Sequence, residues 1–120
     1  MNRSGLFQAA LQILLVQLGD FVFISGLMPR GSDGQMVNGD IASQTKAIMD
    51  SLHSVLKSAD CAFSDVVKCM AWLTDVDNFK AFNATYFDGA SPTRSAVRSG
   101  LLLLGAKLEI EEICHKPLSG

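Results

Sequence analysis

The sequence predicts an α+β fold in which two helices pack on one face of a mixed β-sheet. Residues 40–59 repeat apolar side chains every three or four positions, which is the pattern of a helix that covers a sheet. Short runs of β-branched or alternating residues precede and follow this segment and predict strands. Between the later strands, aromatic residues recur at helical spacing and predict a second, shorter helix.

Composition indicates a single globular domain. The chain has 120 residues, of which 48% are hydrophobic and 18% are charged, and its net charge is −2. A chain of this length can bury one substantial core. Nucleic acid is not a favoured partner, because the chain has no excess of basic charge to neutralise phosphates. The apolar run at residues 11–16 is far shorter than the roughly 20 residues that span a membrane, so we expect no transmembrane segment.

The cysteines predict a reducing compartment. Cys61, Cys69 and Cys114 are odd in number, lack C-x-x-C spacing and lie among apolar residues. We therefore expect buried, reduced thiols and a cytoplasmic location, with the mitochondrion as the alternative. His53 and His115 share no ligand-like spacing with the cysteines, which argues against a metal site.

The first half of the chain predicts a hairpin, a loop and the long helix. Periodicity leaves the type of the apolar stretch 11–18 open, but the Gly19-Asp20 turn would let it pair with a strand at 21–25. Turn-forming residues follow over 26–34. Asp40 is the expected N-cap of the helix, whose apolar face extends to Ala59.

The second half predicts a strand at 66–73, a short helix, a strand at 95–98 and a last strand at 107–114. In the first of these strands, Val67 is expected on the same face as Cys69, with Val66 and Trp72 on the other face. Asp75 or Asp77 can cap the short helix, which the turn at 88–89 would end. Its aromatic stripe, interpreted as core, consists of Phe79, Phe82 and Tyr86.

One face of the sheet is expected to lack a helix. Period two places Glu109 and Glu111 on the face opposite Leu108 and Ile110. A small sheet that carries Met70, Trp72 and two glutamates on its uncovered face would expose an apolar patch. We therefore expect the chain to self-associate.

The stretch Ser91-Pro92-Thr93-Arg94 is the main candidate for function. Pro92 has a fixed φ and biases Ser91 toward extended geometry, so this turn delivers Arg94 at a defined point. A positioned guanidinium offers a planar fork for a carboxylate or a phosphate. The alternative interpretation of Arg94 alone is a solvated loop cation.

Six motifs in series then resemble a known family. They are GDFVFISG at 19–26, DVVK at 65–68, LTDVDNF at 73–79, NATY at 83–86, PTRS at 92–95 and LEIE at 108–111. Through them, the chain resembles the YjgF family of reactive intermediate (enamine/imine) deaminases. The resemblance implies a domain over residues 19–120, with residues 1–18 as a divergent N-terminal segment of the same domain. It also implies a chorismate-mutase-like fold, a homotrimeric barrel with ligand sites between subunits, and no metal or organic cofactor.

The resemblance implies hydrolysis of short-lived enamines and imines, such as 2-aminoacrylate, to 2-keto acids and ammonia. Arg94 would bind the substrate carboxylate and Glu109 would position water. Further pocket positions implied by the resemblance are Ser25, Gly26, Asn83 and Ala96. Two other functions stay open: a non-catalytic module that binds small carboxylates or 2-keto acids, and the ribonuclease or translation-inhibitor activity attributed to some relatives.

Overall fold

The structure is a computed structural model that describes residues 15–86 and 93–116. Its elements are β1 (Leu15–Leu18), β2 (Phe21–Leu27), α1 (Ile41–Ser58), β3 (Val66–Leu73), α2 (Phe79–Tyr86), β4 (Thr93–Arg98) and β5 (Leu108–His115). This is the predicted order of elements. The expected N-terminal segment up to residue 14, the turns at 88–89 and 91–92, and the tail after residue 116 lie outside the described residues.

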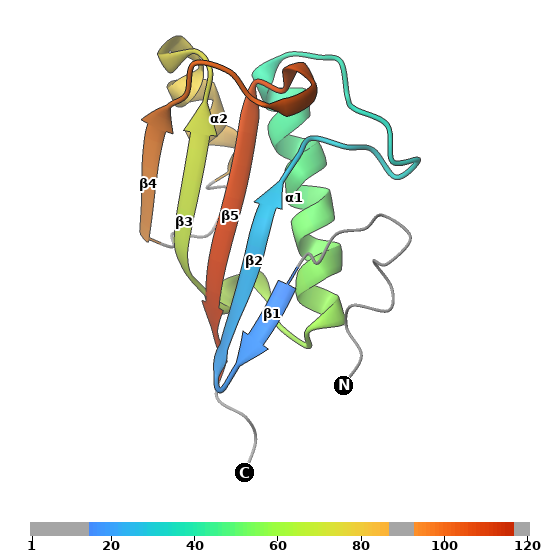
Figure 1. Ribbon diagram of the computed structural model, residues 1–120, viewed down its shortest axis with the longest axis vertical. Helices are drawn as coiled ribbons and strands as arrows, with labels where there is room; N and C mark the ends of the chain where they lie inside the picture. The colour runs from blue at the N-terminus through green and yellow to red at the C-terminus, as the bar shows by residue number, and fades with distance from the viewer. Residues whose placement is uncertain (1–14, 87–92, 117–120) are drawn as a thin grey trace.

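The strands form one mixed sheet in the order β1-β2-β5-β3-β4. β3 and β4 run parallel, and the other neighbours are antiparallel. Both helices lie on the same side of the sheet, as predicted (Figure 1). The core lies between these two layers and includes the fully buried Ile48, Leu52, Leu56, Phe82, Ala71, Leu108 and Ile110. Within the described residues, no helix is long and apolar enough to cross a membrane.

The predicted hairpin is confirmed for β1 and β2, which pair from Leu15–Ile24 to Leu18–Phe21. Gly19 has a φ of +58° at the first position of the two-residue turn, which favours glycine. β2 continues two residues beyond the predicted strand because a bulge between Ile24 and Leu27 lets it keep pairing with β5.

A second bulge corrects the predicted faces of β3. Val66 is buried and Val67 is 44% exposed, the reverse of the strict alternation expected for these two residues. The register with β5 shifts between Val66 and Lys68, so Val67 is the extra residue of the bulge. From Cys69 onward, the predicted alternation holds, with Cys69, Ala71 and Leu73 buried beneath the helices.

Asp40 caps α1 as predicted. Its Oδ1 accepts a hydrogen bond of 2.9 Å from the amide of Ser43, and this bond lowers the pKa of the Asp40 carboxyl. The helix ends at Ser58, and Asp60 then reverses the chain with a φ of +57°. A non-glycine residue tolerates this left-handed conformation at a cost of about 1 kcal/mol.

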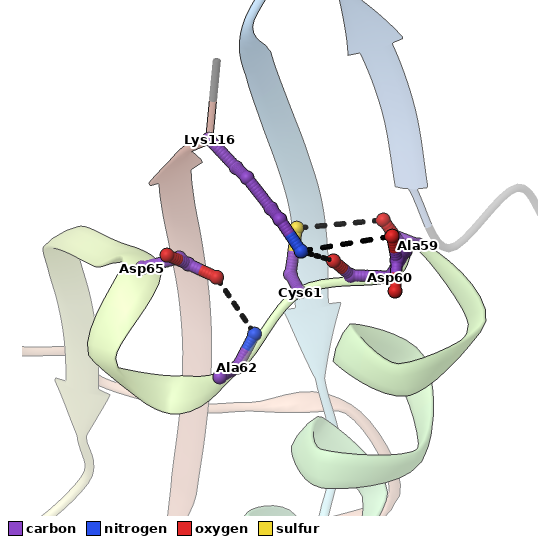
Figure 2. A network of polar contacts seen from close by, with 6 residues as sticks. All are labelled: Ala59, Asp60, Cys61, Ala62, Asp65 and Lys116. Atoms are coloured by element: carbon purple, nitrogen blue, oxygen red, sulfur yellow. Dashed lines mark hydrogen bonds and ion pairs between the residues drawn. The ribbon is translucent and has the colours of Figure 1, made fainter. Parts of the chain in front are cut away.

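A polar network fixes the connection that follows α1 to the end of β5 (Figure 2). Lys116 donates through Nζ to the backbone carbonyl of Asp60 and lies 3.6 Å from its carboxylate. One step along the connection, Oδ2 of Asp65 accepts a hydrogen bond of 2.8 Å from the amide of Ala62. Lys116 therefore links the C-terminal end of α1 to the end of β5.

The opposite face of the sheet carries the residues that the sequence placed there. Met70 pairs with Glu111 and Trp72 with Glu109 across β3 and β5. Among the described residues, no helix covers this face (Figure 1). It also carries the large exposed apolar side chains of Phe21 (43%), Phe23 (41%) and Val97 (43%).

Candidate functional site

Arg94 is the second residue of β4 and does not belong to the turn that precedes the strand. It pairs with Cys69 in the parallel ladder. Paired residues point to the same side of a sheet, and Cys69 is fully buried on the helix side. The Arg94 side chain therefore lies on the helix side, at the edge strand of the sheet.

The helix α2 holds the Arg94 side chain from two directions. Its Nε donates a hydrogen bond of 2.7 Å to Oδ1 of Asn83. Its Cζ lies 5.3 Å from the ring centroid of Phe79, which is the geometry of a cation–π contact. Phe79 is 37% exposed, so its predicted role as core is wrong: Phe82 and Tyr86 are core, and Phe79 faces the guanidinium.

Ala96 follows Arg94 on the same side of β4, where it pairs with Ala71 and packs against the core. It also lines an apolar pocket of about 240 Å³. The other lining residues come from the end of β3, from the turn before α2 and from β4: Leu73, Val76, Phe79, Val97 and Arg98. The structure thus groups Arg94, Asn83 and Ala96, which we call the arginine half-site.

Glu109 lies on the other face of the sheet, beside Gly26. Its partner Trp72 stands between Ala71 and Leu73, both of which point to the helices, so Glu109 points away from them. A Cβ atom at Gly26 would overlap Oε2 of Glu109 and lie 2.9 Å from its Cδ. Glycine at position 26 therefore gives the carboxylate its place over β2.

Ser25 adjoins this glycine in the β2 bulge, and the two residues with Glu109 form what we call the glutamate half-site. The Ser25 Oγ is buried and has no hydrogen-bond partner among the described residues. Such an atom ordinarily has a partner, so Ser25 is a polar group that the described residues leave unsatisfied.

A groove of about 660 Å³ begins at Gly26 and Glu109. It is also lined by Met28, Arg30, Leu103 and Leu104 and reaches α1 at Ser51 and Val55. Arg30 donates from Nη1 to the carbonyl of Gly34 over 2.9 Å. The sequence analysis did not single out Arg30, because it lies in a cluster of turn formers, where a cation is ordinary.

The two half-sites do not meet within one chain. Glu109 on β5 pairs with Trp72 of β3, whereas Arg94 on β4 pairs with Cys69 of β3. The strand β4 lies two strands away from β5 in the sheet. Strand spacing and rise per residue put their backbones about 14 Å apart, on opposite faces of the sheet. A ligand bound at both residues must therefore contact two copies of the chain.

Sequence reasoning also missed Glu112, which is 1% exposed beneath the helices. The Tyr86 hydroxyl donates to its Oε1, while Oε2 has no partner among the described residues. Burial raises the pKa of Glu112 to about 7 against the opposing effects of Tyr86 and Cys69. The burial of Glu112 could have been predicted from the sequence, because strict alternation places Glu112 on the same buried face as Leu108 and Ile110.

The described residues contain no group of three or more His, Cys, Asp or Glu side chains that could hold a metal ion. Cys69 and Cys114 are buried free thiols, and burial raises the pKa of each to about 12. Cys61 is only partly buried. The expected absence of a metal or cofactor stays a prediction.

Comparisons with known proteins match this architecture. Residues 10–116 match the family described as Endoribonuclease L-PSP. Protein DfrA of Myxococcus xanthus is 37% identical over 85% of this chain and 81% of its own length. The 2-iminobutanoate/2-iminopropanoate deaminase of Mus musculus is 36% identical over 82% of this chain and 76% of its own length.

Among solved structures, E. coli TdcF with bound serine superimposes with a TM-score of 0.82 at 29% identity. The superposition covers 88% of this chain and 87% of TdcF. The resemblance seen in the sequence is thus confirmed. The chain belongs to the endoribonuclease L-PSP family, which is also called the YjgF/RutC family.

Proposed function

We propose that this protein hydrolyses short-lived enamines and imines of small amino acids, such as 2-aminoacrylate, to 2-keto acids and ammonia. The observation that carries the proposal is the pair of half-sites, one with a held guanidinium and one with a carboxylate given room by a glycine. The mouse, rat and human relatives named 2-iminobutanoate/2-iminopropanoate deaminase, at 33% to 36% identity, support the reaction class.

The two half-sites divide the chemistry of imine hydrolysis. The Arg94 guanidinium binds the substrate carboxylate and fixes the orientation of the imine carbon. Glu109 accepts a proton from water as the water oxygen bonds to that carbon. The imine nitrogen takes up this proton, which gives a carbinolamine. As the carbon–nitrogen bond breaks, the hydroxyl proton passes to the departing nitrogen, and a 2-keto acid and ammonia are left. No electron is transferred to or from an external group, so the reaction needs no redox cofactor.

The site is completed by two subunits of a homotrimer in this proposal. The uncovered sheet face, with Met70, Trp72 and the exposed apolar side chains beside them, is a surface that a second copy would bury. Contact between copies through this face would bring the Glu109 of one chain toward another chain. Light scattering should give about three times 12.9 kDa.

Subunit mixing tests the divided site. Arg94→Ala and Glu109→Gln are each expected to be inactive alone, because each removes one half-site from every active site. After unfolding and refolding of an equimolar mixture, about a quarter of wild-type turnover should return if Arg94 and Glu109 of each site come from different chains. A mixture without activity would overturn the divided site, and a wild-type protein without turnover would overturn the deaminase function.

Measurements on the wild-type protein also distinguish the deaminase from the non-catalytic binding module. Binding of a 2-keto acid without turnover of enzymatically generated 2-aminoacrylate would favour the binding module. Cleavage of RNA in parallel incubations would instead favour the ribonuclease activity, against which the net charge of −2 argues.

A further inference from the structure

Glu112 is a buried carboxyl group that the proposed reaction does not use. Its side chain is 1% exposed and lies between the sheet and α2, with Tyr86 as donor to one oxygen. A carboxyl group is rarely placed in a core unless it is paired there. Its neighbours therefore indicate what it does.

In the sheet, Glu112 shares a register row with the arginine half-site. Cys69 pairs with Glu112 on one side and with Arg94 on the other, and Cys69 and Glu112 are both buried beneath the helices. Glu112 and Arg94 are thus two strands apart, about 10 Å, with one thiol between them. This separation is too long for a direct ion pair.

A second connection runs through α2. Tyr86, held by Glu112, contacts the ring of Phe82 at 5.5 Å between centroids, and Phe82 contacts Phe79 at 6.4 Å. Phe79 lies against the Arg94 guanidinium. Asn83, one turn before Tyr86, accepts a hydrogen bond from Nε of Arg94. Four residues on one side of this eight-residue helix therefore join Glu112 to Arg94.

We call the hydrogen bond from Tyr86 to Glu112 the anchor of α2. A hydrogen bond is directional, so the bond from Tyr86 to a carboxyl oxygen fixes the position of the last turn of α2 relative to β5. Apolar packing alone would let this turn shift slightly over the sheet. The other titratable groups around Glu112 are Cys69 on β3 and Cys114 on its own strand. From α1, the ring of His53 contacts Phe63, whose ring contacts Tyr86.

We propose that Glu112 is a positioning residue for Arg94: by holding Tyr86, it sets the last turn of α2 and thereby the place of Asn83 and Phe79 around the guanidinium. This inference rests on the proposed function for the meaning of Arg94 as the carboxylate-binding group. The effect of Glu112 on the position of α2 does not depend on the proposed function.

The test compares Glu112→Ala and Tyr86→Phe, which break the anchor, with Glu112→Gln, whose amide oxygen still accepts from Tyr86. Val22→Ala is the matched control, because Val22 is 2% exposed in the same core but lies on β2, away from α2. The first readout is affinity for 2-oxobutanoate by calorimetry. The second is the rate at which phenylglyoxal modifies Arg94, measured by peptide mass spectrometry with Arg98 as internal standard.

Both anchor-breaking variants should weaken 2-oxobutanoate binding by about threefold to tenfold, the effect of one lost hydrogen bond. They should also raise the modification rate of Arg94 relative to Arg98. Glu112→Gln and Val22→Ala should stay within about twofold of wild type in both readouts. A purely structural role would instead make the two readouts follow thermal stability, with Val22→Ala as affected as Glu112→Ala.

The inference is overturned if Glu112→Ala and Tyr86→Phe leave both readouts unchanged, or if Val22→Ala changes them equally. If Glu112→Ala does not fold, the milder Tyr86→Phe decides. If the wild-type protein binds no 2-oxobutanoate, the phenylglyoxal rates alone decide the role of Glu112, whereas the proposed function is decided separately by turnover of 2-aminoacrylate.

Discussion

Glu109 and Glu112 lie three residues apart on β5 and face opposite sides of the sheet. Glu109 borders a groove and lies over a glycine, where water can reach it. Glu112 lies in the core, where burial raises its pKa to about 7 and a tyrosine hydroxyl occupies one of its oxygens. The same chemical group is thus offered to a ligand on one face and locked into the structure on the other.

The difference shows that the face of a strand, more than the residue type, decides what a carboxyl group can do. A carboxylate that handles protons must reach water or substrate. A carboxyl group in the core must instead satisfy its neighbours, and its ionisation changes stability. Substitutions on the two faces should therefore affect different measurements.

The largest expected effect is on turnover, from Glu109→Gln. The amide keeps the shape of the side chain but cannot accept a proton, so turnover of 2-aminoacrylate should fall about 10²- to 10⁴-fold while thermal stability stays near wild type. Glu111→Gln is the matched control, because Glu111 is exposed on the same face, opposite Met70. Equal losses in both variants would contradict the assignment of Glu109.

On the opposite face, Glu112→Gln should change how stability depends on pH. A folded-state pKa of about 7, raised above the reference value of 4.5, means that the folded protein holds a proton that the unfolded chain has released. This contribution to stability is present below pH 4.5 and is lost as pH rises toward 7, by about 3 kcal/mol in total.

The variant lacks this loss because an amide does not titrate in this range. Urea unfolding at constant protein concentration should therefore show the variant gaining stability relative to wild type, by about 3 kcal/mol between pH 4.5 and pH 8. A difference that stays constant with pH would mean that Glu112 does not titrate in this window.

A second arginine sharpens the comparison, because Arg30 lines the groove that Glu109 borders. Arg94→Ala should weaken binding of 2-keto acids by about 1.5–3 kcal/mol, and Arg94→Lys should restore little because an ammonium lacks the planar fork. Arg30→Ala, in the groove beside Glu109, should leave binding unchanged. The reverse result in calorimetry would place the carboxylate site in the groove that Glu109 borders, within one chain.

The smallest effect is expected from Gly26→Ala. The new methyl group would overlap the flexible end of Glu109, so the carboxylate should move aside at little cost in stability. A displaced carboxylate should lower turnover about tenfold. Gly100→Ala is the control, because no atom lies within 4 Å of its added Cβ. Full activity of Gly26→Ala would show that the place of Glu109 over β2 is not needed.

Much of the architecture follows from local sequence patterns. The period of α1, its Asp40 cap and the Gly19-Asp20 turn act over a few residues, and each predicted its element correctly. Strict alternation also predicted the faces of β5, including that of Glu109. The exchange of Val66 and Val67 could not be predicted, because a bulge arises from pairing with a strand that is distant in sequence.

By itself, the sequence determined the helix and strand segments, the family and the residues to examine, because periodicity, capping and motif spacing are local properties. Only the tertiary structure decided which of these residues meet. Asn83 joins Arg94 through a helix packed on an edge strand, Gly26 makes room for Glu109 across a sheet, and Arg94 and Glu109 point to opposite faces. Sheet register sets these contacts, and register depends on the pairing of whole strands and on no single segment.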